Sequence, residues 1–175
     1  QEAYEQFLDS EVVEMVKLSG DKCDCGSKKK RGWCCYATIN GTKWQALVFP
    51  VISNLQKLSN HLALLIPSSS DAQDKQSRDL DFLQTMVPDR WEDLYNNRNS
   101  LHNLSNPEFC GKLRVLKKLL RFWHANGDKV LVFSHSVKLL KMLQHLFHNT
   151  SYNVSFLDGS LSYPERQAVV DDFNS

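Results

Sequence analysis

The chain has 175 residues, of which 42% are hydrophobic and 23% are charged, values typical of a soluble globular protein with a sizeable core. Lys and Arg together number 21 against 20 Asp and Glu, so bulk charge indicates no acidic partner and any such signal is local. No apolar run is long enough to span a bilayer and no signal-peptide pattern is present, which predicts no membrane association. The chain begins with Gln1 rather than Met, which predicts that the natural N-terminus lies upstream.

Residues 1–66 are predicted to be a helical region that carries an inserted loop. Apolar residues at helical spacing predict one helix within residues 1–18 and another within residues 47–66. Between them, residues 20–44 are rich in Gly, Lys and Cys, which is typical of an insert. Residues 67–110 are predicted to be a linker with short helices, and the polar segment PSSSDAQDKQSRD at its start is predicted to be a mobile surface linker.

Four of the five cysteines crowd into the insert: Cys23, Cys25, Cys34 and Cys35. A total of five is odd, and four crowd into one short stretch, which is a poor disulfide framework and favours a metal site in a reducing compartment. Four thiolates form a closed tetrahedral zinc site, whose negative charge the nearby Lys and Arg residues would offset. Two alternatives stay open. Adjacent Cys34 and Cys35 would leave one cysteine as a spectator if their side chains point to opposite faces, or all four are free thiols in a surface loop.

Two further features of this region have plain interpretations. The basic run Lys28–Arg31 is interpreted as a solvated loop, with contact to nucleic acid or a nuclear signal as alternatives. His61 is interpreted as a helix-packing or capping residue rather than a ligand.

Residues 111–175 alternate between helical and strand patterns. Residues 111–125 are predicted to be an amphipathic helix that ends at Asn-Gly-Asp, and the apolar run 129–134 is predicted to be a strand buried on both faces. A helix follows with Ser136 as its N-cap, then a strand over residues 153–157, then a helix whose start, Ser162 to Glu165, fits a capping box. This βαβα order predicts an α/β fold with a parallel sheet.

The loops after the two predicted strands are the candidate binding site. Both supply hydroxyls and backbone N–H groups at a helix N-terminus, which favours phosphate. The residues are Ser134, His135, Ser136, Asp158, Gly159 and Ser160. The alternative is that these loops only cap helices and form an ordinary turn. No catalytic residue is predicted, because the chain has no glycine-rich phosphate loop and the neighbouring Ser and His of the first loop cannot pair as nucleophile and base.

Several short motifs occur in a recognisable order. The third stretch contains, in order, Gly-Lys-Leu, Val-Leu-Val-Phe-Ser, Leu-Asp-Gly-Ser, Glu-Arg and Phe-Asn, while LQKLSNHLALL and QEAYEQFL lie upstream. This order resembles the opening half of the second RecA-like lobe of Snf2-family DNA translocases. The insert, with Cys-x-Cys, eight residues and Cys-Cys, is similar to that of the excision-repair-cross-complementing-like branch, which is related to the Cockayne syndrome B protein and includes Hebo-like proteins.

The resemblance implies a nuclear, DNA-dependent ATPase that moves along double-stranded DNA in repair or chromatin remodelling. It implies that ATP and Mg²⁺ bind mainly through the first RecA-like lobe of the same polypeptide, so that this chain alone does not hydrolyse ATP. It also implies sequence-independent phosphate contacts from the two loops. The chain departs from the family at His135, Phe156 and Leu161, where Gln, Arg and Thr are common.

Two other functions stay open from the sequence. One is a non-enzymatic protein-interaction module built around a zinc-binding cysteine insert. The other is an unrelated Rossmann-like domain that binds a small molecule.

Overall fold

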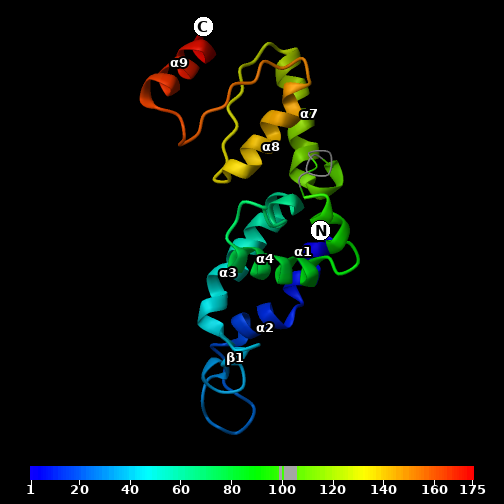
Figure 1. Cartoon of the computed structure of the whole chain (residues 1–175), viewed down its shortest axis with the longest axis vertical. Helices are drawn as coiled ribbons and strands as arrows, with labels where there is room; N and C mark the ends of the chain where they lie inside the picture. The colour runs from blue at the N-terminus through cyan, green and yellow to red at the C-terminus, as the bar shows by residue number, and fades with distance from the viewer. Residues whose placement is uncertain (99, 101–105) are drawn as a thin grey trace. The chain divides into compact units, whose positions relative to one another are not determined.

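A computed structural model describes residues 1–98, 100 and 106–175 of the chain (Figure 1). It divides into two compact units, residues 1–99 and residues 100–175. Residues 99 and 101–105, within the predicted linker region, lie outside the described residues. None of the described helices is both long and apolar enough to cross a membrane.

The first unit consists of helices with a small antiparallel hairpin. Its elements are α1 (Glu2–Leu8), α2 (Glu11–Leu18), the 3-10 turn η1 (Arg31–Trp33), β1 (Thr38–Ile39), β2 (Thr42–Lys43), α3 (Trp44–Asn60), the 3-10 turn η2 (Leu62–Leu64), α4 (Gln73–Met86) and α5 (Trp91–Asn96). The prediction of one helix in residues 1–18 is wrong. Ser10 adopts an extended conformation and its hydroxyl donates to the Phe7 carbonyl at 2.6 Å, so α1 ends and α2 begins there.

The core of the first unit forms where α1, α4 and α5 bring large apolar side chains together. Phe7, Leu83, Met86 and Leu94 are almost fully buried. Phe7 also meets Phe82 edge to face, with ring centroids 5.8 Å apart, which fixes α1 against α4. His61 caps η2, because its Nδ1 accepts from the Ala63 N–H at 3.0 Å, which confirms the predicted capping role.

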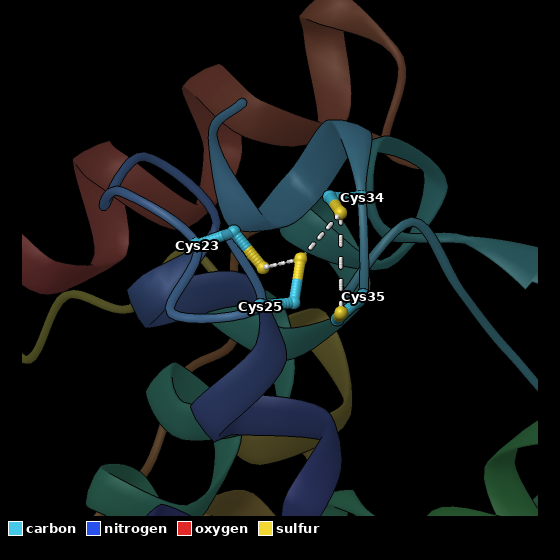
Figure 2. A group of neighbouring side chains, drawn as sticks. All are labelled: Cys23, Cys25, Cys34 and Cys35. Atoms are coloured by element: carbon cyan, nitrogen blue, oxygen red, sulfur yellow. Dashed lines mark hydrogen bonds between the residues drawn. The ribbon is translucent and has the colours of Figure 1, made fainter. Parts of the chain in front are cut away.

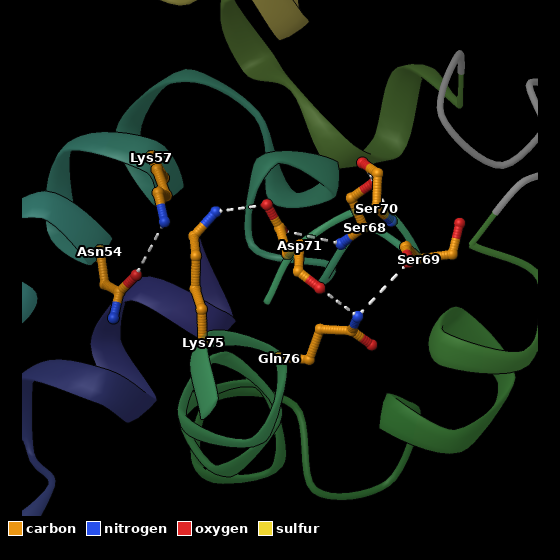
Figure 3. A network of polar contacts seen from close by, with 8 residues as sticks. All are labelled: Asn54, Lys57, Ser68, Ser69, Ser70, Asp71, Lys75 and Gln76. Atoms are coloured by element: carbon orange, nitrogen blue, oxygen red, sulfur yellow. Dashed lines mark hydrogen bonds and ion pairs between the residues drawn. The ribbon is translucent and has the colours of Figure 1, made fainter. Parts of the chain in front are cut away.

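The polar segment predicted to be a surface linker, residues 67–79, forms a hydrogen-bonded turn followed by the first half of α4. Asp71 organises this turn: its carboxylate accepts from the Ser68 N–H at 3.2 Å and pairs with Lys75 at 2.7 Å, while its carbonyl accepts from the Gln76 amide at 2.6 Å (Figure 3). The polar first turns of α4 belong to a helix whose apolar residues lie further along, at Leu83 and Met86. Composition in a short window therefore misses the helix.

A hairpin closes the insert before α3. Thr38 pairs with Lys43 and Ile39 pairs with Thr42. The turn residues Asn40 and Gly41 have φ of 46° and 79°, the two positive values that a type I′ turn requires.

The second unit contains η3 (Pro107–Phe109), α7 (Gly111–Ala125), α8 (Val137–His148) and α9 (Tyr163–Asn174). The predicted break after residue 125 is confirmed. Gly127 has a φ of 76°, its N–H donates to the His124 carbonyl at 3.1 Å, and the Asp128 N–H donates to the Trp123 carbonyl at 2.9 Å. These two bonds form a Schellman motif, which satisfies the last carbonyls of α7.

The starts of α8 and α9 are as predicted. The Ser136 hydroxyl accepts from the Leu139 N–H at 3.2 Å and caps α8. At α9, the Glu165 carboxylate accepts from the Ser162 N–H at 2.7 Å, which forms the predicted capping box, and Pro164 lies in the first turn.

A small core joins α7 and α8. Cys110, Leu113 and Phe147 are buried, and six partly buried residues pack against them: Leu116, Leu120, Leu143, Leu146, Tyr152 and Val154. Tyr152 and Val154 come from the extended segment after α8, where half-buried and exposed residues alternate from Tyr152 to Leu157. One side of that segment therefore lies on the helices, as in a strand with one covered face.

The prediction of a parallel sheet is not met in the described residues. Segments 129–134 and 153–157 carry no strand pairing, and the sheet in the described part of the chain is the β1–β2 hairpin. A parallel strand obtains its ladder hydrogen bonds and its apolar cover from neighbouring strands and helices. Leu131 and Phe133, predicted to be buried, are 65% and 86% exposed because no such neighbours cover them here.

Candidate metal centre and nucleic-acid loops

The four cysteines of the insert converge on one point (Figure 2). The Sγ atoms of Cys23 and Cys25 are 3.3 Å apart, those of Cys25 and Cys34 are 3.3 Å apart, and those of Cys34 and Cys35 are 3.9 Å apart. All four lie within 4.8 Å of one another, and each is a free thiol. Folding thus brings together residues up to twelve positions apart in the chain.

The backbone of the insert explains this convergence. Lys22 and Lys30 form an isolated antiparallel bridge that closes the loop around Cys23 and Cys25. Cys34 follows η1 with φ of −142° and ψ of −109°, outside the regular strand and helix regions. This conformation directs both Cys34 and Cys35 toward the cluster, so the alternative in which their side chains point to opposite faces does not describe this structure.

The sulfur geometry fits a tetrahedral metal site. Zinc bound to four thiolates at about 2.3 Å requires sulfur atoms roughly 3.8 Å apart. The distances between successive sulfurs, 3.3 to 3.9 Å, lie near this value without an ion. The charge state is also favourable: a hydrogen bond from the Ser27 hydroxyl, followed by those from Cys23 and Cys34, lowers the pKa of Cys25 to about 6.

The pKa of the fourth thiol shifts in the opposite direction. Hydrogen bonds with Cys23, then with Cys25 and Cys34, raise the pKa of Cys35 to about 12. A bound cation would favour the deprotonated form of all four sulfurs, because thiolates are the metal ligands.

The residues that support the cluster were not predicted. Gly32 is buried against the Trp44 indole, and Trp44 meets Trp33 edge to face with centroids 5.3 Å apart. Arg31 pairs with Asp24 and lies over the Tyr36 ring at 5.3 Å. The Asn-Gly dipeptide of the hairpin is a readable turn signal, whereas nothing in the local sequence marks Gly32 as a packing residue.

The first predicted phosphate loop precedes α8. The Ser134 hydroxyl accepts from the Ser136 N–H at 3.1 Å, while Ser136 is occupied in capping α8. Within the described residues the Ser134 hydroxyl donates to no acceptor, so its proton is free for a ligand, and the His135 side chain is exposed. Ser136 thus has a structural role whichever interpretation of the loop holds.

The second predicted loop precedes α9. Asp158 accepts from both the N–H and the hydroxyl of Ser160, at 2.9 and 2.5 Å. These bonds lower the pKa of Asp158, with smaller contributions from the charges of Lys141 on α8 and Arg166 on α9. In this conformation both Ser160 donors are taken, whereas the Gly159 N–H has no partner among the described residues.

One domain of known proteins matches most of the second unit. Residues 111–175 match the helicase conserved C-terminal domain. Switch 2 of Arabidopsis thaliana is 33% identical over 190 residues, which covers 98% of this chain, and the mouse DNA excision repair protein ERCC-6-like 2 is 35% identical over 175 residues, again 98% of this chain. The chain belongs to the Snf2 helicase-like family. Both alignments run over almost the full length of the chain.

The segment is a small part of these Snf2-family relatives. It spans 22% of Switch 2 and 11% of ERCC-6-like 2. The ATP-dependent DNA helicase DDM1 of Arabidopsis thaliana is 40% identical over 65 residues, 37% of this chain and 8% of that protein. The helicase domain match assigns residues 111–175 to a RecA-like lobe, which supports the predicted lobe although the sheet is unpaired here. No solved structure matches the chain significantly.

Proposed function

We propose that this Snf2-family chain is a segment of a DNA-dependent ATPase that translocates along double-stranded DNA, and that the protein acts in DNA repair or chromatin remodelling in the nucleus. The observation that carries the proposal is the helicase C-terminal domain match over residues 111–175, which includes both candidate loops. The names of relatives support it, since they include excision-repair proteins and an ATP-dependent DNA helicase.

In this proposal the chain supplies contacts to the DNA backbone, while ATP and Mg²⁺ bind mainly through the first RecA-like lobe of the same polypeptide. The free donors suit this role: the Ser134 hydroxyl, the His135 ring and the Gly159 N–H stand at the starts of α8 and α9, where helix dipoles favour anions. Asp158, whose carboxylate is held by Ser160, shapes its loop so that Gly159 can approach a phosphate. Such contacts do not read base sequence and weaken with salt.

Gly159 offers a sharp test. A Cβ at this position would meet nothing within 4 Å, and its φ is not positive, so a side chain is tolerated by the fold. In the full-length protein, Gly159→Leu should therefore block the approach of a phosphate without unfolding the chain, and lower DNA-stimulated ATP turnover and DNA affinity together. Gly20→Leu is the matched control, because Gly20 is equally unobstructed and lies outside the helicase match. Unchanged turnover and affinity in Gly159→Leu would refute the contact.

A second test concerns the chain by itself. The purified 175-residue chain should show no DNA-stimulated ATP hydrolysis, because the phosphate loop and Mg²⁺-binding carboxylates expected for this activity are not in its sequence. ATP turnover that rises with added duplex DNA would contradict this part of the proposal.

The cysteine insert supports a second proposal, a structural zinc site at Cys23, Cys25, Cys34 and Cys35. The four sulfurs already lie within 4.8 Å of one another, and a closed set of four thiolates suits a structural rather than a catalytic ion. Zinc would hold the insert in shape and could present it to a protein partner. Elemental analysis of chain purified without chelators should give one zinc per chain. Cys25→Ala should reduce that ratio, whereas Cys110→Ser, at the cysteine outside the cluster, should not.

A further inference from the structure

The basic run of the insert is arranged so that two positive charges face each other. The Cys23 N–H donates to the Lys29 carbonyl at 2.9 Å and the Arg31 N–H donates to the Asp21 carbonyl at 2.8 Å. These bonds flank Lys22 and Lys30, which therefore form a non-hydrogen-bonded antiparallel pair, the arrangement that brings facing side chains closest. Like charges directly opposite one another are destabilising unless an anion lies between them.

The insert's own acids do not neutralise this pair in the described residues. Asp24 is committed to Arg31, whose guanidinium also lies over Tyr36. Neither Lys22 nor Lys30 has an ion-pair partner in the part of the chain that the structure describes.

The exposed side chain of Trp33 lies one 3-10 turn after Lys30 in the chain. The Trp33 N–H donates to the Lys30 carbonyl at 3.0 Å in the η1 turn, which fixes the backbone between the two residues. Trp33 is 56% exposed, although its edge-to-face contact with Trp44 holds its orientation. A large, oriented and exposed aromatic ring next to unpaired cations is the combination by which proteins bind single-stranded nucleic acid, with bases stacked on the ring and phosphates on the cations.

We propose that Lys22, Lys30 and Trp33 form a binding site for single-stranded nucleic acid. The lysine pair holds a backbone phosphate and Trp33 stacks on a neighbouring base. This site lies in the first unit, outside the helicase C-terminal match, and is separate from the duplex contacts proposed for the loops before α8 and α9. It gives the cysteine insert a function of its own, because the sulfur cluster and Trp44 hold the loop that carries the site.

The test measures fluorescence anisotropy of the 175-residue chain with a fluorescein-labelled oligothymidylate. Trp33→Leu should weaken binding by roughly 5- to 140-fold, the range that corresponds to loss of one stacked base, while Trp33→Phe should retain most of it. Because the pair holds one phosphate, the double variant Lys22→Gln/Lys30→Gln should lower the slope of log K against log salt by roughly 0.7 in total. The control is Lys17→Gln/Lys118→Gln, which makes the same change in net charge at two exposed helical lysines and should leave the slope unchanged.

Three results would overturn the proposal. If Trp33→Leu binds the oligonucleotide as tightly as the parent chain, Trp33 does not stack on a base. If the two lysine double variants lose affinity equally, the lysines act only through the net charge of the chain. If an equal concentration of polyglutamate displaces the oligonucleotide, the site at Lys22, Lys30 and Trp33 binds acidic peptides instead. Far-UV circular dichroism checks that each variant keeps its fold. Gly159→Leu should leave this binding intact, so failure here and failure of the duplex proposal are distinguishable.

Discussion

A methyl group added at Gly32 would enter the space that the Trp44 indole occupies. An ideal Cβ at Gly32 lies 2.6 Å from Nε1 and 2.9 Å from Cε2 of Trp44, and 3.0 Å from the Ser19 Cβ. Gly32 does not have a positive φ, so alanine is compatible with its backbone and the effect of Gly32→Ala is steric. The indole has little freedom to move away, because Trp33 packs against it and Trp44 begins α3.

The expected size follows from these contacts. Overpacking of a filled site usually destabilises by about 1–3 kcal/mol. Replacing glycine by alanine also restricts the unfolded chain, which stabilises the protein by about 0.4–1 kcal/mol. Since the added carbon overlaps two indole atoms, the steric effect is the larger. Gly32→Ala should therefore lower the free energy of unfolding by about 1–2 kcal/mol.

Urea unfolding followed by circular dichroism measures this change, with Gly20→Ala as the control. A Cβ at Gly20 meets nothing within 4 Å, so Gly20→Ala should be neutral or slightly stabilising. Gly32→Ala should also lower zinc content, because Cys34 and Cys35 follow directly after the η1 turn. An unfolding midpoint for Gly32→Ala that equals or exceeds that of Gly20→Ala would show that the Trp44 packing described above is incorrect.

Three further predictions concern the second unit. Leu113→Ala, at a residue only 3% exposed in a small core, should destabilise this unit by about 2–5 kcal/mol, and unchanged protease resistance would contradict that core. Ser136→Ala removes the α8 cap and should cost about 1 kcal/mol in thermal unfolding, whereas Ser155→Ala, at an exposed residue, should be neutral; equal effects would refute the cap. Hydrogen bonds from Ser162 lower the pKa of Glu165, so its capping of α9 is present above the usual value of 4.5 and is lost as the pH falls through the lowered value. Hydrogen exchange at the start of α9 should rise over that range in the parent chain but not in Glu165→Gln.

The helix ends of the second unit were predictable because their causes are local. Ser136, the pair Ser162 and Glu165, and the Asn-Gly-Asp break act within one helical turn, so the sequence alone carries the signal. The sheet was not predictable in the same way. Segment 129–134 has the composition of a buried strand, but its pairing depends on strands that a local pattern cannot supply, and the segment is exposed here.

The cysteine cluster likewise depends on the folded backbone, which a local sequence pattern does not reveal. Spacing predicted a cluster of these four cysteines, but the convergence of Cys34 and Cys35 depends on the unusual backbone at Cys34. The turn before α4 was missed for a related reason: Ser68, Asp71 and Gln76 form a hydrogen-bond network that a polar composition does not reveal. The two phosphate loops stay predictions, although their caps and free donors are now defined.

The exposed segment after α7 has a consequence for handling the chain in solution. Leu131, Val132 and Phe133 are all exposed, and residues 129–133 make no backbone hydrogen bond within the described part of the chain. An extended apolar segment with free backbone donors and acceptors is a template for intermolecular β-pairing, with no charge or proline among these three residues to prevent it. Samples of this chain should therefore aggregate as concentration rises, with growing thioflavin fluorescence, and Val132→Lys should delay that growth without affecting the cysteine insert.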